Sequence, residues 1–195
     1  MTFDLAILMR KRDRSSSIRT ILDLGKQNKT KYGVVDGGST AYFFRSTEKE
    51  GFAYQRMWSV MEGHQSESLL PSVEEAVKRV RQSTDHHPFA FIGEQYTAEY
   101  HASRKPCELA VVRGESKVFD GEYHLAVRTD IGSNYIRELS SALTNLNQTG
   151  KLQELYQKWW IQRAECSHAS TLMTSGVAFL KAGVLAVAIT VLFRE

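Results

Sequence analysis

The sequence lacks the short motifs that mark the common classes of enzyme. It contains no Gly-x-Ser-x-Gly motif, no glycine-rich phosphate-binding loop and no spacing of cysteine or histidine typical of a metal site. Two adjacent histidines, His86 and His87, are surrounded by polar residues and are interpreted as solvated side chains. We therefore expect neither enzymatic activity nor a bound cofactor or metal.

A strong excess of one charge is also missing. The net charge is +3 and the basic residues are scattered among acids, without the stripe that follows a phosphate backbone, so nucleic acid is not an expected partner. The one concentrated run is interpreted as a solvated segment before the domain: Arg10, Lys11, Arg12 and Arg14. With 42% hydrophobic and 24% charged residues, the 195-residue chain can form one globular domain and a short appendage.

Cysteine is scarce, with only Cys107 and Cys166 in the chain. A cytosolic protein often holds such a pair as unrelated free thiols. Two glycosylation sequons favour an oxidising, extracellular setting instead, because Asn28 begins Asn-Lys-Thr and Asn147 begins Asn-Gln-Thr. The N-terminus is a poor signal peptide, since its basic cluster follows the apolar run Phe3–Met9 rather than preceding it.

Short apolar runs alternate with amphipathic stretches over residues 18–167, after a lead-in over residues 1–17 that we expect to be poorly ordered. Strands are predicted at Tyr32–Val35, Phe89–Ile92, Leu109–Val112 and Tyr123–Val127. Helical faces are predicted at Tyr54, Met57, Trp58 and Met61, at Val73, Ala76, Val77 and Val80, and at Ile136, Leu139, Leu143 and Leu146. A capping box at Ser72–Glu75 starts the second helix, and Gly150 ends the third. This alternation predicts an α/β domain with a largely parallel sheet.

The tail differs in kind from the rest of the chain. After a linker over residues 168–175, Gly176–Phe193 is apolar except for Lys181. Its eighteen residues are marginal for a transmembrane helix, which needs about 20 apolar residues. The tail predicts a membrane span, and the alternative is a buried or signal-like apolar helix at the end of a domain.

The most informative stretch joins a β-branched run to a glycine turn and two hydroxyl residues, Ser39 and Thr40. Glycines allow a close backbone approach, and a hydroxyl at a helix start leaves N–H groups pointing outward. Such an end binds anions because its unpaired donors and the helix dipole both favour negative charge. The alternative is an ordinary strand–turn–helix junction with a capping serine.

In its setting this stretch resembles the second ligand-binding segment of ionotropic glutamate receptors. The resemblance rests on an ordered set of short matches over roughly residues 20–167: Gly38-Ser39-Thr40, Phe43-Phe44-Arg45, Met57-Trp58, Glu75–Val80, Phe89–Glu94, Glu99-Tyr100, Arg104–Cys107, Gly150-Lys151-Leu152, Lys158-Trp159-Trp160 and Cys166. It implies one lobe of a periplasmic-binding-protein-like clamshell, followed by a single C-terminal transmembrane helix.

The resemblance also implies a ligand site. Ser39 and Thr40 would hold the side-chain carboxylate of an amino-acid agonist, glutamate in the first place, and Glu94 would bind its ammonium group. A glutamate at position 94 favours the AMPA/kainate-like branch. Tyr123 would pack near the ligand, although Glu122 and His124 replace the glycines of the family's Gly-Tyr-Gly motif. The paired cysteines would form a Cys107–Cys166 disulfide, whose closed loop of about 60 residues would stabilise the fold by roughly 4 kcal/mol.

The implied protein is a ligand-gated cation channel subunit in the plasma membrane, with the lobe outside and the C-terminus in the cytoplasm. A postsynaptic membrane is one of the expected locations. Other receptor subunits would be its partners, as a tetramer. The sequence lacks the first lobe, the pore loop and the gate helix, so we expect a fragment that by itself neither binds agonist tightly nor conducts ions. The alternatives are a truncated subunit that associates with complete ones, a chemosensory ionotropic receptor with another ligand, and a soluble solute-binding protein.

Overall fold

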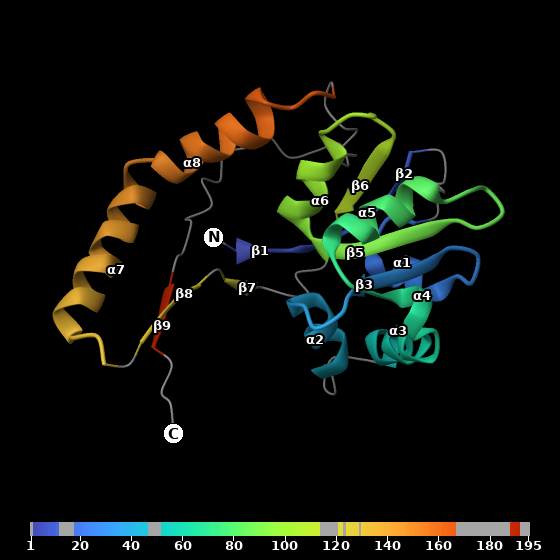
Figure 1. Cartoon of the computed structure of the whole chain (residues 1–195), viewed down its shortest axis with the longest axis horizontal. Coiled ribbons are helices and arrows are strands. Elements are labelled where there is room, and N and C mark those ends of the chain that lie inside the picture. Colours follow the sequence, from blue (N-terminus) through green and yellow to red (C-terminus); the bar gives the residue numbers. More distant parts are fainter. Residues whose placement is uncertain are drawn as a thin grey trace. The chain divides into compact units, whose positions relative to one another are not determined.

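The structure, a computed structural model, describes residues 2–11, 18–46, 52–113, 121–122, 124–128, 130–166 and 188–191. The chain divides into two compact units (Figure 1). The sheet unit comprises Asp4–Phe119 and Ala164–Thr174, and the helical unit comprises Met1–Phe3, Asp120–Arg163 and Ser175–Glu195. The lobe expected over residues 18–167 is therefore divided, because residues 120–163 belong to the helical unit.

Five strands form the sheet of the sheet unit, in the order β4-β3-β5-β2-β6. Strand β3 (Lys31–Val35) runs parallel to β4 (Leu69–Leu70) and to β5 (Phe89–Glu94). Strand β2 (Leu5–Arg10) runs antiparallel to β5 and to β6 (Leu109–Arg113). The predicted α/β class is confirmed, as are three of the predicted strands in this sheet and the fourth at His124–Val127 in the helical unit, but the sheet is mixed rather than largely parallel.

Strand β2 lies where a poorly ordered lead-in was expected. Its residues Ala6 to Met9 are 0% exposed, and the strand pairs with β5 on one side and β6 on the other. A strand buried on both faces has a continuous apolar run rather than an alternation of apolar and polar residues. Because basic residues follow Met9, this short apolar run was assigned to a poorly ordered lead-in, and that expectation was wrong for residues 5–10.

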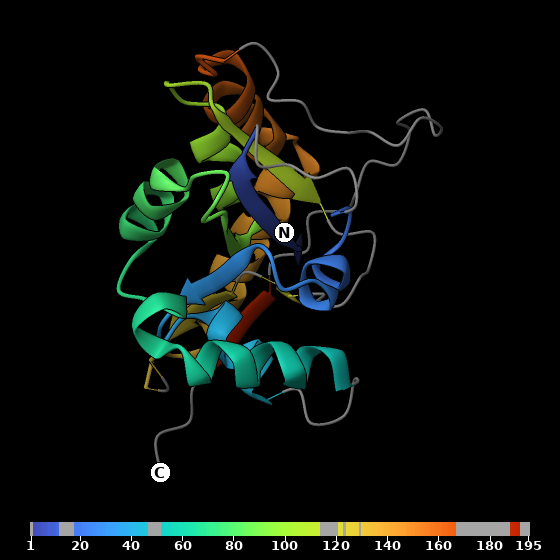
Figure 2. The same cartoon turned by 90° about the vertical axis from the view of Figure 1, so that its right-hand side faces the viewer.

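Helices cover both faces of the sheet (Figures 1 and 2). The first face carries α1 (Ile21–Lys26), α2 (Ser39–Ser46) and α3 (Phe52–Gly63), and the second carries α5 (Val73–Gln82) and α6 (Gln95–Ala102). Along β2, Leu5, Ile7 and Met9 face the first layer, whereas Ala6 and Leu8 face the second. This period of two is the side-chain alternation of a strand. Short helix α4 (Gln65–Ser68) leads into β4.

The helical faces predicted for the sheet unit are largely those that the structure buries. In α3, Tyr54, Met57, Trp58 and Met61 all lie in the core. In α5, Ala76, Val77 and Val80 are buried and Val73 packs against them, and the Ser72 hydroxyl accepts a hydrogen bond from the Glu75 N–H at 3.3 Å. A complete capping box occurs instead at the start of α1, where Thr20 and Asp23 cap each other's backbone N–H groups.

The helical unit contains α7 (Ser133–Gln148), α8 (Lys151–Tyr156) and the π-helix η1 (Gln157–Gln162). Gly150 separates α7 from α8 with a φ of 72°, a left-handed conformation that suits glycine. Two short pairings complete the unit: β1 (Thr2–Phe3) with β7 (Gly121–Glu122), and β8 (His124–Val127) with β9 (Ala188–Val191). None of the residues of α7, α8 and η1 is buried.

The membrane helix predicted over residues 176–193 differs from the structure at its end. Residues 188–191 form strand β9, paired in parallel with β8, and three of the four residue types, Ile189, Thr190 and Val191, are β-branched and favour a strand. The other residues of the predicted helix, including Lys181, lie outside the described residues. Within the described part of the chain, no helix has the length and apolar character needed to cross a membrane.

Candidate functional site

The candidate site lies where β3 and β5 end. These two strands are parallel neighbours, with Gly33 paired to Phe91, so their carboxyl ends lie at the same edge of the sheet. In open α/β sheets, ligands bind outside the carboxyl ends of the strands. The glycine turn after β3 and Glu94, the last residue of β5, both lie at this edge.

The turn after β3 depends on its two glycines. Gly37 has a φ of 67°, which side chains other than glycine rarely adopt, and its N–H donates to the Asp36 carboxylate at 2.9 Å. A Cβ atom on Gly38 would lie 3.3 Å from the Val35 carbonyl oxygen. The Asp36 N–H donates to the Leu70 carbonyl at 2.8 Å, which ties the turn to β4. The turn therefore directs the chain straight into α2.

Helix α2 presents its N-terminus at this edge. Its first intrahelical bond runs from the Tyr42 N–H to the Gly38 carbonyl at 3.0 Å. The N–H groups of Ser39, Thr40 and Ala41 come before this bond, at positions where a helix offers no carbonyl acceptor of its own. Ser39 is exposed, whereas Thr40 is 7% exposed. The orphan donors and the helix dipole make this end suitable for an anion.

Glu94 meets the start of α2 directly. The Ser39 hydroxyl donates a hydrogen bond of 3.2 Å to Oε1 of Glu94, although the two residues are 55 positions apart. Glu94 is half-buried and precedes α6, but its side chain makes no capping bond to that helix. The edge thus combines a carboxylate with a helix N-terminus that carries hydroxyl groups.

A polar network behind Glu94 had no distinct signal in the sequence. Glu99 of α6 accepts a hydrogen bond of 2.6 Å from the Gln95 side chain and pairs with Arg113 of β6 at 2.5 Å. The Glu99 side chain is only 11% exposed. Burial raises the pKa of Tyr96, and the charges of Glu99 and Asp4 raise it further while Arg113 opposes them. The Glu99–Arg113 pair fixes α6, and with it the segment that carries Glu94, to the sheet.

Other predicted residues lie away from this edge or outside the description. Tyr123 is outside the described residues. The structure joins Cys107 and Cys166 in a disulfide with a Cα–Cα distance of 5.5 Å. Asn28 is exposed in the loop between α1 and β3, whereas Asn147 is half-buried near the end of α7. Of the four predicted ligand contacts, Ser39 and Glu94 are joined by a hydrogen bond, and Thr40 follows Ser39 in the first turn of α2.

Known proteins similar to this chain are glutamate receptors. Glutamate receptor 3 of Homo sapiens and that of Rattus norvegicus are each 32% identical to it over 207 residues, covering 100% of this chain and 22% of the relative. A glutamate receptor of Lymnaea stagnalis is 31% identical over 170 residues, covering 87% of this chain and 18% of the relative. The chain belongs to the ionotropic glutamate receptor family.

The chain spans about a fifth of the length of these glutamate receptors, and it matches no family model. The relatives are named as receptors and not as enzymes, in keeping with the expectation of no enzymatic activity. The mixed five-stranded sheet with helices on both faces fits one lobe of the clamshell that the sequence predicted.

Proposed function

We propose that the chain supplies one side of an amino-acid binding site in a ligand-gated cation channel subunit. The observation that carries this proposal is the 3.2 Å hydrogen bond between Ser39 and Glu94. It brings a donor-rich helix start and a carboxylate to one edge of the sheet. Neither feature alone would select an amino acid, because each is common at the ends of strands and helices.

An acidic amino acid has groups that match both features. Its ammonium carries three donors and is satisfied by a carboxylate through charge-assisted hydrogen bonds, the role we assign to Glu94. Its side-chain carboxylate is an acceptor and suits the start of α2, where Ser39 and Thr40 add hydroxyl donors to the backbone N–H groups. The α-carboxylate needs a partner on the facing lobe. Glutamate is therefore the ligand that this edge supports best.

The test is a receptor chimera. This lobe would replace the corresponding lobe of a complete receptor of the same class, and agonist dose–response would be measured with and without Glu94→Ala. Loss of Glu94 leaves a desolvated ammonium without its partner, which costs roughly 3–5 kcal/mol. Agonist potency should fall at least about a hundredfold, since 1.4 kcal/mol is about tenfold.

The matched control is Glu75→Ala, which removes an exposed acid on α5 that pairs only weakly with Lys78 at 3.2 Å. This control should leave agonist potency unchanged. Surface labelling of each chimera separates a binding defect from a failure to reach the membrane. A Glu94→Ala chimera that reaches the surface with unaltered potency would contradict the proposed site.

The proposed subunit lies in the plasma membrane with the sheet unit outside, and it assembles with other subunits. A second candidate is a truncated, non-conducting subunit that associates with complete receptors. It is favoured by the large apolar side chains exposed on the helical unit: Tyr135, Leu146, Leu155, Trp159 and Ile161. Co-purification with a complete subunit, compared between the native chain and Leu155→Glu, tests that association.

A further inference from the structure

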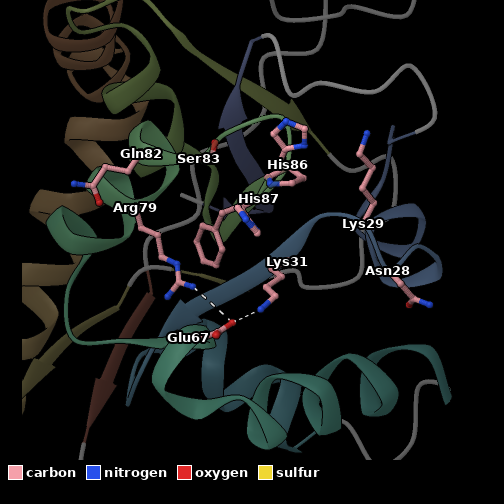
Figure 3. Close-up of a pocket in the computed structure, with 11 residues that line it drawn as sticks. Asn28, Lys29, Lys31, Glu67, Arg79, Gln82, Ser83, His86 and His87 are labelled. Carbon is pink, nitrogen blue, oxygen red and sulfur yellow. Dashed lines mark hydrogen bonds and ion pairs between the residues drawn. The ribbon is translucent and has the colours of Figure 1, made fainter.

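A second polar site lies at the opposite edge of the sheet from Ser39 and Glu94. A pocket of about 340 Å³ opens where β3 and β5 begin, bounded by Lys31, by Phe89 and by the end of α5 (Figure 3). Three cations line it, Lys29, Lys31 and Arg79, against the single carboxylate of Glu67. The charged side chains that line this pocket therefore carry a net positive charge.

Two of these cations already converge on a carboxylate. Lys31 contacts Oε2 of Glu67 at 2.5 Å, and Arg79 lies 4.0 Å from the same oxygen (Figure 3). The hydrogen bond from Lys31 is the largest influence on the pKa of Glu67 and lowers it, so this carboxylate stays ionised. The guanidinium of Arg79 also stacks 4.4 Å from the Phe89 ring centroid, which fixes its direction.

More donors surround this pair. His86 and His87 line the pocket from the turn before β5, and Lys29 lines it from the loop after α1 (Figure 3). Beside them, the Arg10 guanidinium donates to the Ser83 carbonyl at 2.7 Å, at the end of α5. Since β2 is antiparallel to β5, Arg10 at the end of β2 lies at this same edge, where it is also paired with Glu108 at 3.3 Å.

We propose that this pocket binds a sulfate- or phosphate-type oxyanion, free or carried on a sugar. Glu67 marks the place where Lys31 and Arg79 converge on one anionic oxygen, and the pocket beside it offers further donors to a second anion. The volume of about 340 Å³ leaves room for a group larger than the oxyanion itself. The proposal does not depend on the amino-acid site, which lies at the other edge.

The test uses the full purified chain with its intact disulfide. Sodium sulfate and a heparin-derived sulfated disaccharide are titrated at constant ionic strength, with chloride as balancing anion, and amide shifts in nuclear magnetic resonance report binding. Arg79→Gln should weaken both ligands at least about tenfold, because a charge-assisted contact is lost. Glu67→Gln should tighten binding severalfold, because it removes the competing carboxylate. Opposite effects of the two variants are not expected from a merely structural role.

The controls come from the same helix. Lys78 and Glu75 form an exposed ion pair outside the pocket. Lys78→Gln therefore removes a positive charge, as Arg79→Gln does, and Glu75→Gln removes a negative charge, as Glu67→Gln does, but neither changes a residue that lines the pocket. Unchanged affinity in these controls supports the proposal. An Arg79→Gln chain that binds as tightly as the native one, or an equal loss in Lys78→Gln, overturns it. Tighter binding of the disaccharide than of free sulfate identifies a sugar-borne oxyanion, and equal binding identifies the free ion.

Discussion

Ser39 and Glu94 meet through a hydrogen bond of 3.2 Å, from the start of one helix to the residue before another. The contact is possible because β3 and β5 are adjacent and parallel, so the segments that follow them emerge side by side. Two features that are ordinary in isolation thereby become one polar site. The sheet order, rather than either motif, makes the proposed recognition of an amino acid physically coherent.

The disulfide should contribute strongly to the stability of the sheet unit. Cys107 and Cys166 are 59 positions apart, and closing a loop of that length stabilises the fold by roughly 4 kcal/mol in the chain-entropy model. Cys107→Ser with Cys166→Ser should lower the free energy of unfolding in denaturant by about that amount. Peptide mapping of non-reduced protein should recover the linked pair. Complete alkylation of both thiols in the folded, oxidised protein would contradict the linkage.

Stability should also depend on the protonation of His101. Burial lowers the pKa of His101 from its ordinary value of about 6.5, the charge of Arg81 lowers it further, and Glu74 opposes them. The unfolded chain then binds a proton at a higher pH than the folded chain. The free energy of unfolding should therefore fall as the pH drops from above about 6.5 through the lower folded pKa, by at most about 1.4 kcal/mol per pH unit.

The measurement is denaturant unfolding between neutral and mildly acidic pH. His101→Gln should reduce this dependence, while His86→Gln, which changes an exposed histidine, should leave it unaltered. Identical pH profiles for the native and His101→Gln proteins would show that His101 does not contribute.

Local patterns predicted the elements whose signals lie within a few residues. The buried face of α3 follows the helical spacing of Tyr54, Met57, Trp58 and Met61, and Gly150 ends its helix as expected. Strand β2 was missed because its identity depends on partners far along the chain, with Ile7 paired to Ile92 and Val112. The Glu99–Arg113 pair was missed for the same reason, since no local pattern indicates a pairing across an intervening loop.

Predicting the site required the ordered set of matches to the family as well as local sequence patterns. The glycine turn alone fits an ordinary strand–turn–helix junction, and Glu94 alone resembles a surface acid at the end of a strand. What brings them together is strand adjacency, which a single sequence does not encode locally. The division of residues 18–167 into two units was likewise not predicted, because the apolar faces of the later helices resemble those of the core.

The predicted membrane topology can be tested through the sequons. If residues 176–193 span the membrane with the sheet unit in the lumen, translation in microsomes should add a glycan to Asn28 or Asn147. Asn28 is the better acceptor candidate in the folded protein because it is exposed, whereas Asn147 is half-buried. Asn28→Gln should then remove one glycan-dependent shift in electrophoretic mobility. Absence of glycan on both residues would remove the support for this orientation.

Thr40 offers the finest test of the amino-acid site. It is 7% exposed and lies in the first turn of α2, next to the Ser39 that contacts Glu94. In the receptor chimera, Thr40→Ala should remove one hydrogen bond to the agonist's side-chain carboxylate, at a cost of roughly 1.5–3 kcal/mol. Agonist potency should fall about tenfold to a hundredfold, less than for Glu94→Ala.

The matched control is Thr144→Ala on α7, where the threonine hydroxyl donates to the Ser140 carbonyl at 2.9 Å and is exposed. It removes a similar hydroxyl but lies outside the proposed site, so potency should not change. A second agonist, which lacks the side-chain carboxylate, distinguishes loss of this contact from a general effect on the site, because Thr40→Ala should barely affect its potency. If the variant weakened both agonists equally, Thr40 would act through the packing of α2 and the carboxylate contact would have to be assigned elsewhere.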